Sequence, residues 1–289
     1  MIQKYLLCRP TGGFNDTLNQ IMRSYYYCKT YNRCLLIDTK YESCFDKSFH
    51  EYFTFINIEI NIIYNYNDIY NLITNNNFST FPDIFTNNIF NYRLTWKGDG
   101  NCYINDTCLP IVNINTNYNE DIIIYNSTGG GIIESLSLLK IIKINDNIVS
   151  EIINRYNKIN KPYISIHIRN TDYKTDYVQL YNNNKEIIHN NNIFLATDSK
   201  IVLEYFNNLK LNIFNFISTL NNENKPIHHK YINNDKHQVM IDTVCDLIIL
   251  ALGDRFILPS EYFGFTRLAY TLYNNKDIVY NLISNALPH

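Results

Sequence analysis

The chain has 289 residues, of which 46% are hydrophobic, and a formal net charge of −2. This length suits one large domain or two domains of about 100–150 residues each. The near-neutral charge argues against a broadly basic nucleic-acid surface, although a local pocket for a small anion remains compatible with it. No run of about 18 apolar residues is present, so we expect no membrane span.

The cysteines and the first ten residues indicate a reduced, cytoplasmic protein. The seven cysteines are an odd set without a C-x-x-C pair, which argues against a structural zinc site. Cys8, Cys34 and Cys245 lie in apolar runs that are typical of buried thiols. The chain reaches Arg9 and Pro10 after a short apolar run, too soon for a signal peptide.

The start of the chain predicts a strand, a glycine turn, a helix and a second strand, in that order. Residues 3–8 form the first strand, and the Gly12–Gly13 pair marks a tight turn before the helix. Apolar residues recur at helical spacing over residues 17–31, and residues 34–38 form a second buried strand. This order is typical of an α/β layer with a parallel sheet.

Strands and helices alternate again in the second half. Residues 50–120 show only weak patterns, whereas residues 121–125 predict a strand and residues 146–158 a helix that leads to Lys161–Pro162. The following segments predict strands at 163–168, 193–197 and 255–259 and helices at 199–209, 238–253 and 263–272. We therefore predict an α/β fold with two domains, residues 1–160 and residues 161–289.

Polar residues follow four of the predicted strands. The clusters are Arg9 to Asp16, His167 to Asp176, Asp198–Ser199 and Ser260 to Arg267. Ligands of open parallel sheets bind beyond the carboxyl ends of the strands, although strand ends also meet ordinary polar loops. In the first cluster, Gly12 and Gly13 allow a close backbone approach, and the next helix offers free N–H groups to an anion.

The second cluster holds the residue types that a phosphate site needs. His167 and Arg169 alternate with isoleucines, so both side chains point to one face of a strand end. The arginine can bind two phosphate oxygens, Asp172 can orient it, and Asp176 is available for acid–base work. The alternative is a structural ion pair in a surface loop.

The fourth cluster precedes a predicted helix. Ser260, Thr266 and the backbone at Gly264 lie where a helix N-terminus would face a phosphate. For Thr266 alone, an ordinary N-cap is the competing interpretation.

Several of these segments resemble the superfamily of α-1,2-, α-1,6- and protein O-fucosyltransferases. "HIRNTD" fits its H-x-R-x-x-D motif and is closest to the α-1,6 type, which has a second arginine where this chain has Asn170. "FLATDSK" resembles the second shared motif, "CDLIILALGDRFILPSEYFGFTRLAYTL" the third, and "GGFNDTLNQ" the glycine-rich turn. Residues 40–155 carry no such resemblance.

The resemblance implies a GT-B fold, with two Rossmann-like domains that face a cleft. The C-terminal domain would bind a GDP-sugar, and the N-terminal domain would lie on the acceptor side. L-fucose would pass from GDP-fucose to a glycan hydroxyl with inversion and without a metal ion or other cofactor. The chain contains no D-x-D motif of the kind that metal-dependent sugar transferases use.

The resemblance also assigns roles to single residues. Arg169 would bind the β-phosphate, positioned by Asp172, and His167 and Asp198 would contact the guanosine. Ser260 and Thr266 would hold phosphate oxygens.

Two questions stay open at the level of the sequence. The base glutamate of the α-1,6 type falls on Tyr177, so the neighbouring Asp176 and the N-terminal Asp16 are equal candidates for the base. The donor is a GDP-sugar only if Asp198 contacts guanine; a UDP- or dTDP-linked deoxysugar, or a catalytically inactive glycan- or nucleotide-binding protein, are the alternatives.

Overall fold

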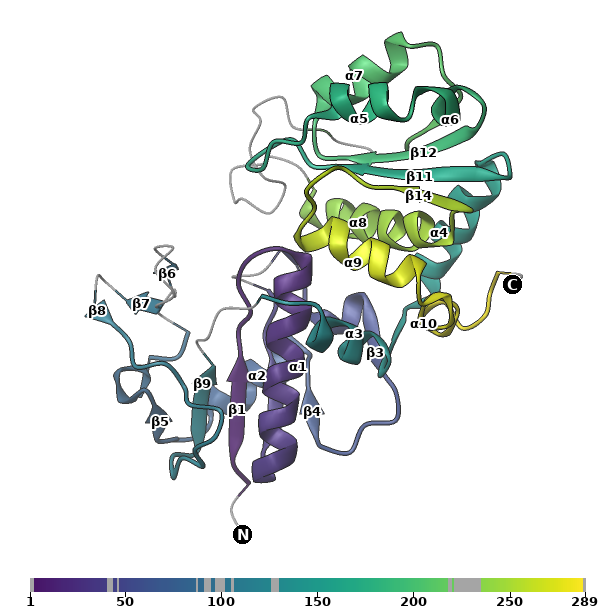
Figure 1. The fold of residues 1–289 in the computed structure, drawn as a ribbon. Coiled ribbons are helices and arrows are strands. Elements are labelled where there is room, and N and C mark those ends of the chain that lie inside the picture. Colours follow the sequence, from purple (N-terminus) through teal and green to yellow (C-terminus); the bar gives the residue numbers. More distant parts are fainter. Residues whose placement is uncertain are drawn as a thin grey trace. The chain divides into compact units, whose positions relative to one another are not determined.

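The chain forms two compact α/β units, residues 1–142 and 143–289 (Figure 1). The computed structural model describes residues 3–40, 44–45, 47–86, 88–90, 95–96, 102–104, 107–125, 130–217, 220 and 235–287. None of the helices in these segments combines the length and the apolar character that a membrane crossing requires.

The first unit is built on a five-stranded parallel sheet in the order β4-β2-β1-β9-β5. Its central strand pairs Leu6 with Leu35 on one side and with Ile123 on the other. The strands are mostly apolar, because helices and loops cover both faces of such a sheet. They are β1 (Tyr5–Cys8), β2 (Cys34–Ile37), β4 (Ile62–Ile63), β5 (Thr80–Phe81) and β9 (Ile122–Tyr125).

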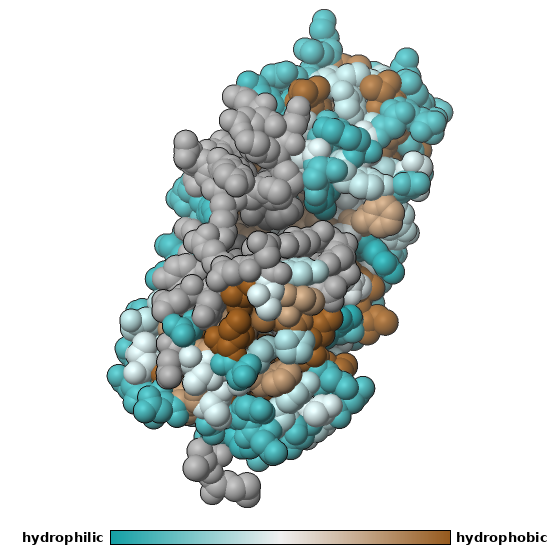
Figure 2. All heavy atoms as spheres, turned by 90° about the vertical axis from the view of Figure 1, so that its left-hand side faces the viewer, coloured by the Kyte–Doolittle hydropathy of each residue, from teal (hydrophilic) through white to brown (hydrophobic). Residues whose placement is uncertain are grey.

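Helices and several short elements surround this sheet. The helix α1 (Phe14–Tyr31) packs against β1 and β2, and α2 (Tyr66–Thr74) shares a core with Leu7 and Leu36. Figure 2 shows a face on which apolar residues of this unit are exposed among hydrophilic ones. The remaining elements are η1 (Phe49–Glu51), β3 (Phe53–Phe55), η2 (Asp83–Phe85), β6 (Thr95–Trp96), β7 (Cys102–Ile104), β8 (Thr107–Cys108) and α3 (Ile133–Leu139).

The second unit is a parallel sheet with helices on both faces. Its strands, in the order β13-β12-β11-β14, are β13 (Ile213–Phe214), β12 (Asn192–Thr197), β11 (Tyr163–Ile168) and β14 (Arg255–Ile257). Figure 1 places α5 (Tyr177–Asn183), α6 (Lys185–His189) and α7 (Lys200–Asn208) on one face. The other face carries α4 (Asp146–Lys158), α8 (Lys236–Leu252) and α9 (Gly264–Tyr273), followed by α10 (Lys276–Leu282). The predicted α/β class is confirmed.

The two compact units divide before α4, whereas the sequence places the domain boundary after residue 160. β10 (Ile142–Ile144) contains the division. Arg155 of α4 donates to Asp242 of α8 at 2.6 Å, and both side chains are buried. Because a buried ion pair requires its partner, α4 belongs with the second unit. The Lys161–Pro162 pair is therefore a turn within that unit.

The end of α8 shows why a glycine follows it. A Cβ at Gly253 would lie 2.2 Å from the Ser165 hydroxyl of β11, so only glycine permits this approach of helix end and strand. The predicted helix end at Gly253 is confirmed.

Cys8, Cys34 and Cys245 are buried, free thiols, as predicted, and burial raises the pKa of Cys8 to about 12.

Candidate functional site

The carboxyl ends of β11, β12 and β14 bring three of the four predicted polar clusters to one edge of the second sheet. His167 pairs with Ala196 and Ile168 with Thr197, so the loops that follow β11 and β12 start side by side. The backbone N–H of Asn170 donates to Asp198 at 2.7 Å across these loops. The first of the four clusters, which holds Gly12, Gly13 and Asp16, belongs to the first unit.

Arg169 and Asp172 form a two-point ion pair at this edge. The guanidinium Nε donates to Asp172 Oδ1 at 2.8 Å and Nη2 to Oδ2 at 2.5 Å. The side chains are 29% and 39% exposed, so the pair lies at the surface of the edge. The pairing that we expect between these two residues is present, and Nη1 has no partner in it. The arginine is thus oriented while one of its nitrogens stays available to an anion.

His167 lies behind the arginine and is held neutral. Its Nδ1 lies 2.7 Å from the Thr266 hydroxyl, and its ring packs against Phe265 at 5.0 Å between centroids. Burial, and then the nearby Arg169 charge, lower the pKa of His167 to about 3. Thr266 is itself buried, and its hydroxyl faces the histidine. This contact fixes the orientation of the His167 ring.

The start of α9 lies against the arginine. Gly264 has a φ of +48°, and a Cβ there would lie 3.6 Å from Arg169 Nη1. The first N–H groups of a helix carry partial positive charge and bind anions readily. Arg169 and the N-terminus of α9 therefore combine two features that stabilise a phosphate. Ser260, on the loop before α9, is exposed and its hydroxyl has no partner in the described chain.

Asp198 anchors the loop that carries the arginine. It accepts from the Asn170 N–H and from the Thr171 hydroxyl at 2.6 Å. Burial raises the pKa of Asp198, against the effect of these hydrogen bonds. A carboxylate has about four acceptor positions, so a donor on a ligand can still bind it. Thr171 was not among the predicted residues, because its contact with Asp198 depends on the neighbouring strand.

Asn170 stands where the H-x-R-x-x-D motif of α-1,6-fucosyltransferases has a second arginine. Its side chain is turned toward Ser199. It is buried and donates to the Ser199 hydroxyl at 3.2 Å. The amide thus ties the loop after β11 to the start of α7. Of the two arginines in that motif, this chain therefore has only Arg169.

The two candidate bases both make local backbone contacts. Asp176 is the N-cap of α5 and accepts from the Gln179 N–H at 2.8 Å. Asp16 accepts from the Gly13 N–H at 3.3 Å, because α1 begins at Phe14, earlier than the sequence predicts.

Two loops at the edge are joined by residues that the sequence did not single out. The Tyr173 hydroxyl donates to Glu261 at 2.7 Å, and its ring meets Phe263 edge-on at 5.2 Å. Phe263 is 55% exposed and directly precedes Gly264. The sequence held one signal of this contact: Tyr173 and Phe263 are aromatic residues that each lie in an otherwise polar loop.

Solved structures of fucosyltransferases share the fold of this chain. NodZ α-1,6-fucosyltransferase soaked with GDP-fucose aligns over 94% of this chain and 93% of its own, with a TM-score of 0.62 and 16% identity. Selenomethionine NodZ from Bradyrhizobium gives 0.62 and 17% with the same coverage. A variant of FUT1 from Arabidopsis thaliana in complex with GDP gives 0.50 and 9%, over 94% of this chain and 68% of that one.

At the level of sequence alone, no family model and no curated protein matches the chain. The structural likeness concerns the fold, since the identities are low. The chain has the two-domain α/β fold of GT-B fucosyltransferases, which is the fold class predicted from its motifs.

Proposed function

We propose that the chain is a glycosyltransferase that moves L-fucose from GDP-fucose to a glycan hydroxyl. The observation that carries the proposal is the position of Arg169. It is paired with Asp172 at the carboxyl edge of the second sheet and lies against the N-terminus of α9. The fold is shared with fucosyltransferases that were studied with GDP-fucose and GDP.

The arrangement suits stabilisation of a departing nucleoside diphosphate. The acceptor oxygen forms a bond to the anomeric carbon of the sugar while the bond from that carbon to the β-phosphate oxygen breaks. Negative charge develops on the phosphate, where Arg169 and the N–H groups of α9 stabilise it. Attack in line with departure inverts the anomeric carbon. Because the protein supplies positive charge, this scheme requires no metal ion.

The remaining predicted residues take supporting roles in this proposal. His167 is neutral and buried, so it offers a hydrogen-bonding ring to the nucleoside without adding charge, and Thr266 orients it. Asp198 accepts from the guanine edge with its remaining oxygen lone pairs. Ser260 donates its exposed hydroxyl to a phosphate oxygen.

The proton of the acceptor hydroxyl passes to an aspartate. Asp16 and Asp176 remain the two candidates, and each accepts a hydrogen bond from a backbone N–H. The glycine turn at Gly12 and Gly13 would place Asp16 on the acceptor side.

A thermal-shift comparison of GDP, UDP and dTDP tests the donor. A ligand at about 100 times its Kd stabilises the folded state by about 2.7 kcal/mol, so the bound nucleotide is recognised by the rise in Tm. We expect GDP to raise Tm most and Arg169→Ala to remove that rise. A rise with UDP or dTDP alone would assign the site to another nucleotide deoxysugar.

One observation favours a second candidate, a nucleotide-binding protein without transfer. Asn170 replaces the second arginine of the motif, and its side chain is turned to Ser199. Incubation with GDP-fucose separates the two, because release of GDP, even slow, contradicts an inactive protein. GDP binding without any release over a day would support it.

A further inference from the structure

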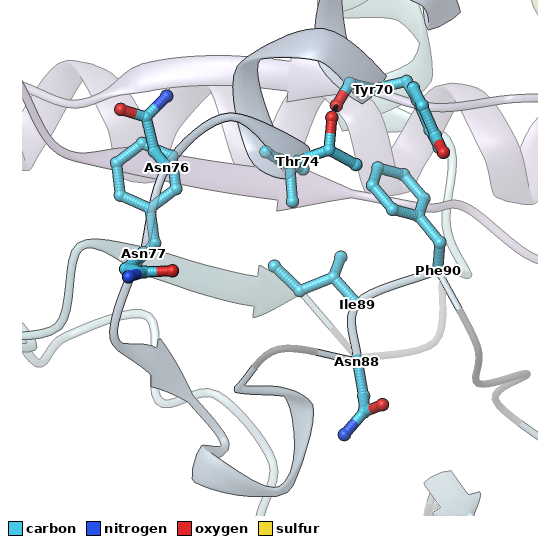
Figure 3. A pocket seen from close by; sticks show the side chains of 9 residues that line it. Tyr70, Thr74, Asn76, Asn77, Asn88, Ile89 and Phe90 are labelled. Carbon is cyan, nitrogen blue, oxygen red and sulfur yellow. Dashed lines mark hydrogen bonds between the residues drawn. The ribbon is translucent and has the colours of Figure 1, made fainter.

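The first unit contains a cavity that the proposed donor chemistry does not use. It lies between α2 and residues 88–90 and has a volume of about 390 Å³ (Figure 3). In Figure 3, Tyr70 and Phe90 lie together at one end, Asn76 and Asn77 at the other, and Asn88 and Ile89 along the floor. All of these residues belong to residues 40–155, the part of the chain that shows no resemblance to the fucosyltransferase motifs.

The lining combines apolar rings with uncharged polar groups. Tyr70, Phe78 and Phe90 supply rings, and Thr74, Asn76, Asn77 and Asn88 supply hydroxyl and amide groups. None of the described residues that line the cavity is charged. A phosphate or carboxylate ligand would therefore find no cation among these described residues. Thr74, Asn76 and Asn88 already donate to backbone carbonyls, so a purely apolar ligand would above all deprive the Asn77 amide of water.

Tyr70 presents a ring and a hydroxyl to a ligand. The side chain is 43% exposed, and its ring lies 5.1 Å from that of Phe90 at an angle of 42°. Neither its hydroxyl nor the exposed Asn77 amide has a hydrogen-bond partner in the described chain. An aromatic body with a polar tip beside the Asn77 amide suits a ligand that has both C–H faces and hydroxyl groups.

The wall at Phe90 is fixed from the interior of the unit. Arg9 donates to the Ile89 carbonyl at 3.0 Å and lies over the Phe90 ring, 5.8 Å from its centroid. Arg9 is in turn paired with Asp38 at 2.9 Å, with both side chains buried. A wall held this way is preorganised, which lowers the cost of binding. These contacts also give Arg9 a structural role, whereas its position in the sequence placed it in a cluster that could bind an anion.

We propose that this cavity binds a neutral oligosaccharide. A neutral sugar ring has an apolar C–H face for Tyr70 and Phe90 and hydroxyl groups for the Tyr70 hydroxyl and the Asn77 amide. The proposal concerns binding alone. That the bound sugar is part of the acceptor is a further step, which rests on the proposed fucosyl transfer.

Saturation-transfer NMR on the full chain tests whether the cavity binds a sugar, with lactose, cellobiose and N,N′-diacetylchitobiose as probes. Each is used at about 10 mM, in excess of a Kd of about 1 mM. We expect transfer to at least one of these disaccharides, and a Kd at least about fivefold higher for Tyr70→Ala and for Asn77→Ala. The matched control is Tyr26→Ala, because Tyr26 is a tyrosine of α1 that is 45% exposed. It should bind like the unmodified chain.

Two results would overturn the proposal. One is no transfer to any of the three disaccharides, and the other is unchanged binding in both Tyr70→Ala and Asn77→Ala. The rise in Tm with GDP is measured on the same samples. Sugar binding without a GDP effect refutes the proposed function alone, whereas a GDP effect without sugar binding refutes this inference alone.

Discussion

Replacing Arg169 with alanine should abolish transfer while leaving the fold intact. The Arg169–Asp172 pair is 29% and 39% exposed, so solvent screens it, and pairs of this kind contribute about 0–1 kcal/mol to stability. A loss of that size lowers Tm by no more than about 2–4 °C. The side chain is needed far more in the transition state, where losing one donor to developing charge costs about 2.7–4 kcal/mol.

The expected result is therefore a separation of activity from stability. We expect kcat to fall about 10²–10³-fold, measured as GDP released from GDP-fucose in the presence of a glycan mixture. Circular dichroism melts of the same preparation give Tm. Arg169→Lys should restore little, because a lysine cannot form the two-point contact with Asp172.

Arg255→Ala provides a matched control. Arg255 is an exposed arginine at the amino end of β14, in the same sheet, and it is paired in register with Ile164. This variant should retain full activity. If Arg169→Ala keeps kcat within a factor of about three, or if both variants lose activity alike, the assignment of the phosphate site to Arg169 is refuted.

Four further substitutions test the rest of the site and the core behind it. Asp16→Asn and Asp176→Asn distinguish the candidate bases, since an asparagine side chain does not accept a proton but can still cap α5 at position 176. We expect one of the two variants to lower kcat by about 10²–10⁴-fold. Small effects in both variants would exclude both aspartates as the base. Thr266→Val leaves the buried His167 ring without its hydroxyl partner and should cost about 1–3 kcal/mol of unfolding free energy in urea, so an unchanged midpoint would contradict the pairing. Burial raises the pKa of Asp246 to about 8, above that of the unfolded chain, so its contribution to stability is present below about pH 4 and is lost as pH rises through about 8. Asp246→Asn should therefore stabilise the chain more at pH 8 than at pH 5 in urea titrations, and equal effects at both pH values would contradict the raised pKa.

Strands and long helices were predictable because their signals are local. β11 and β12 appear in the sequence as apolar runs, since a parallel strand covered on both faces has no polar alternation. The end of α8 at Gly253 was likewise predictable. Between residues 50 and 120 the elements are short, such as the two-residue strands β4 and β5, and too few residues repeat to give a period.

The partners of polar side chains were predictable only where they lie close in the sequence. Arg169 and Asp172 are three residues apart, and their pairing could be expected from the H-x-R-x-x-D motif. The contact between His167 and Thr266 joins residues 99 positions apart, and Asp198 reaches Thr171 across 27. Neither contact could be expected from the sequence, because each joins residues of separate segments.

Local patterns along the chain were enough to predict the α/β class, the strand that ends near His167 and Arg169, and an arginine placed to bind an anion. The folded chain was needed to see that Thr266 contacts His167, that α4 belongs to the second unit, and that a cavity lies beside Tyr70. The reason is physical. Periodicity reports the burial of a segment's own side chains, whereas a hydrogen bond or a cavity depends on the distance between atoms that the folded chain brings together from separate segments.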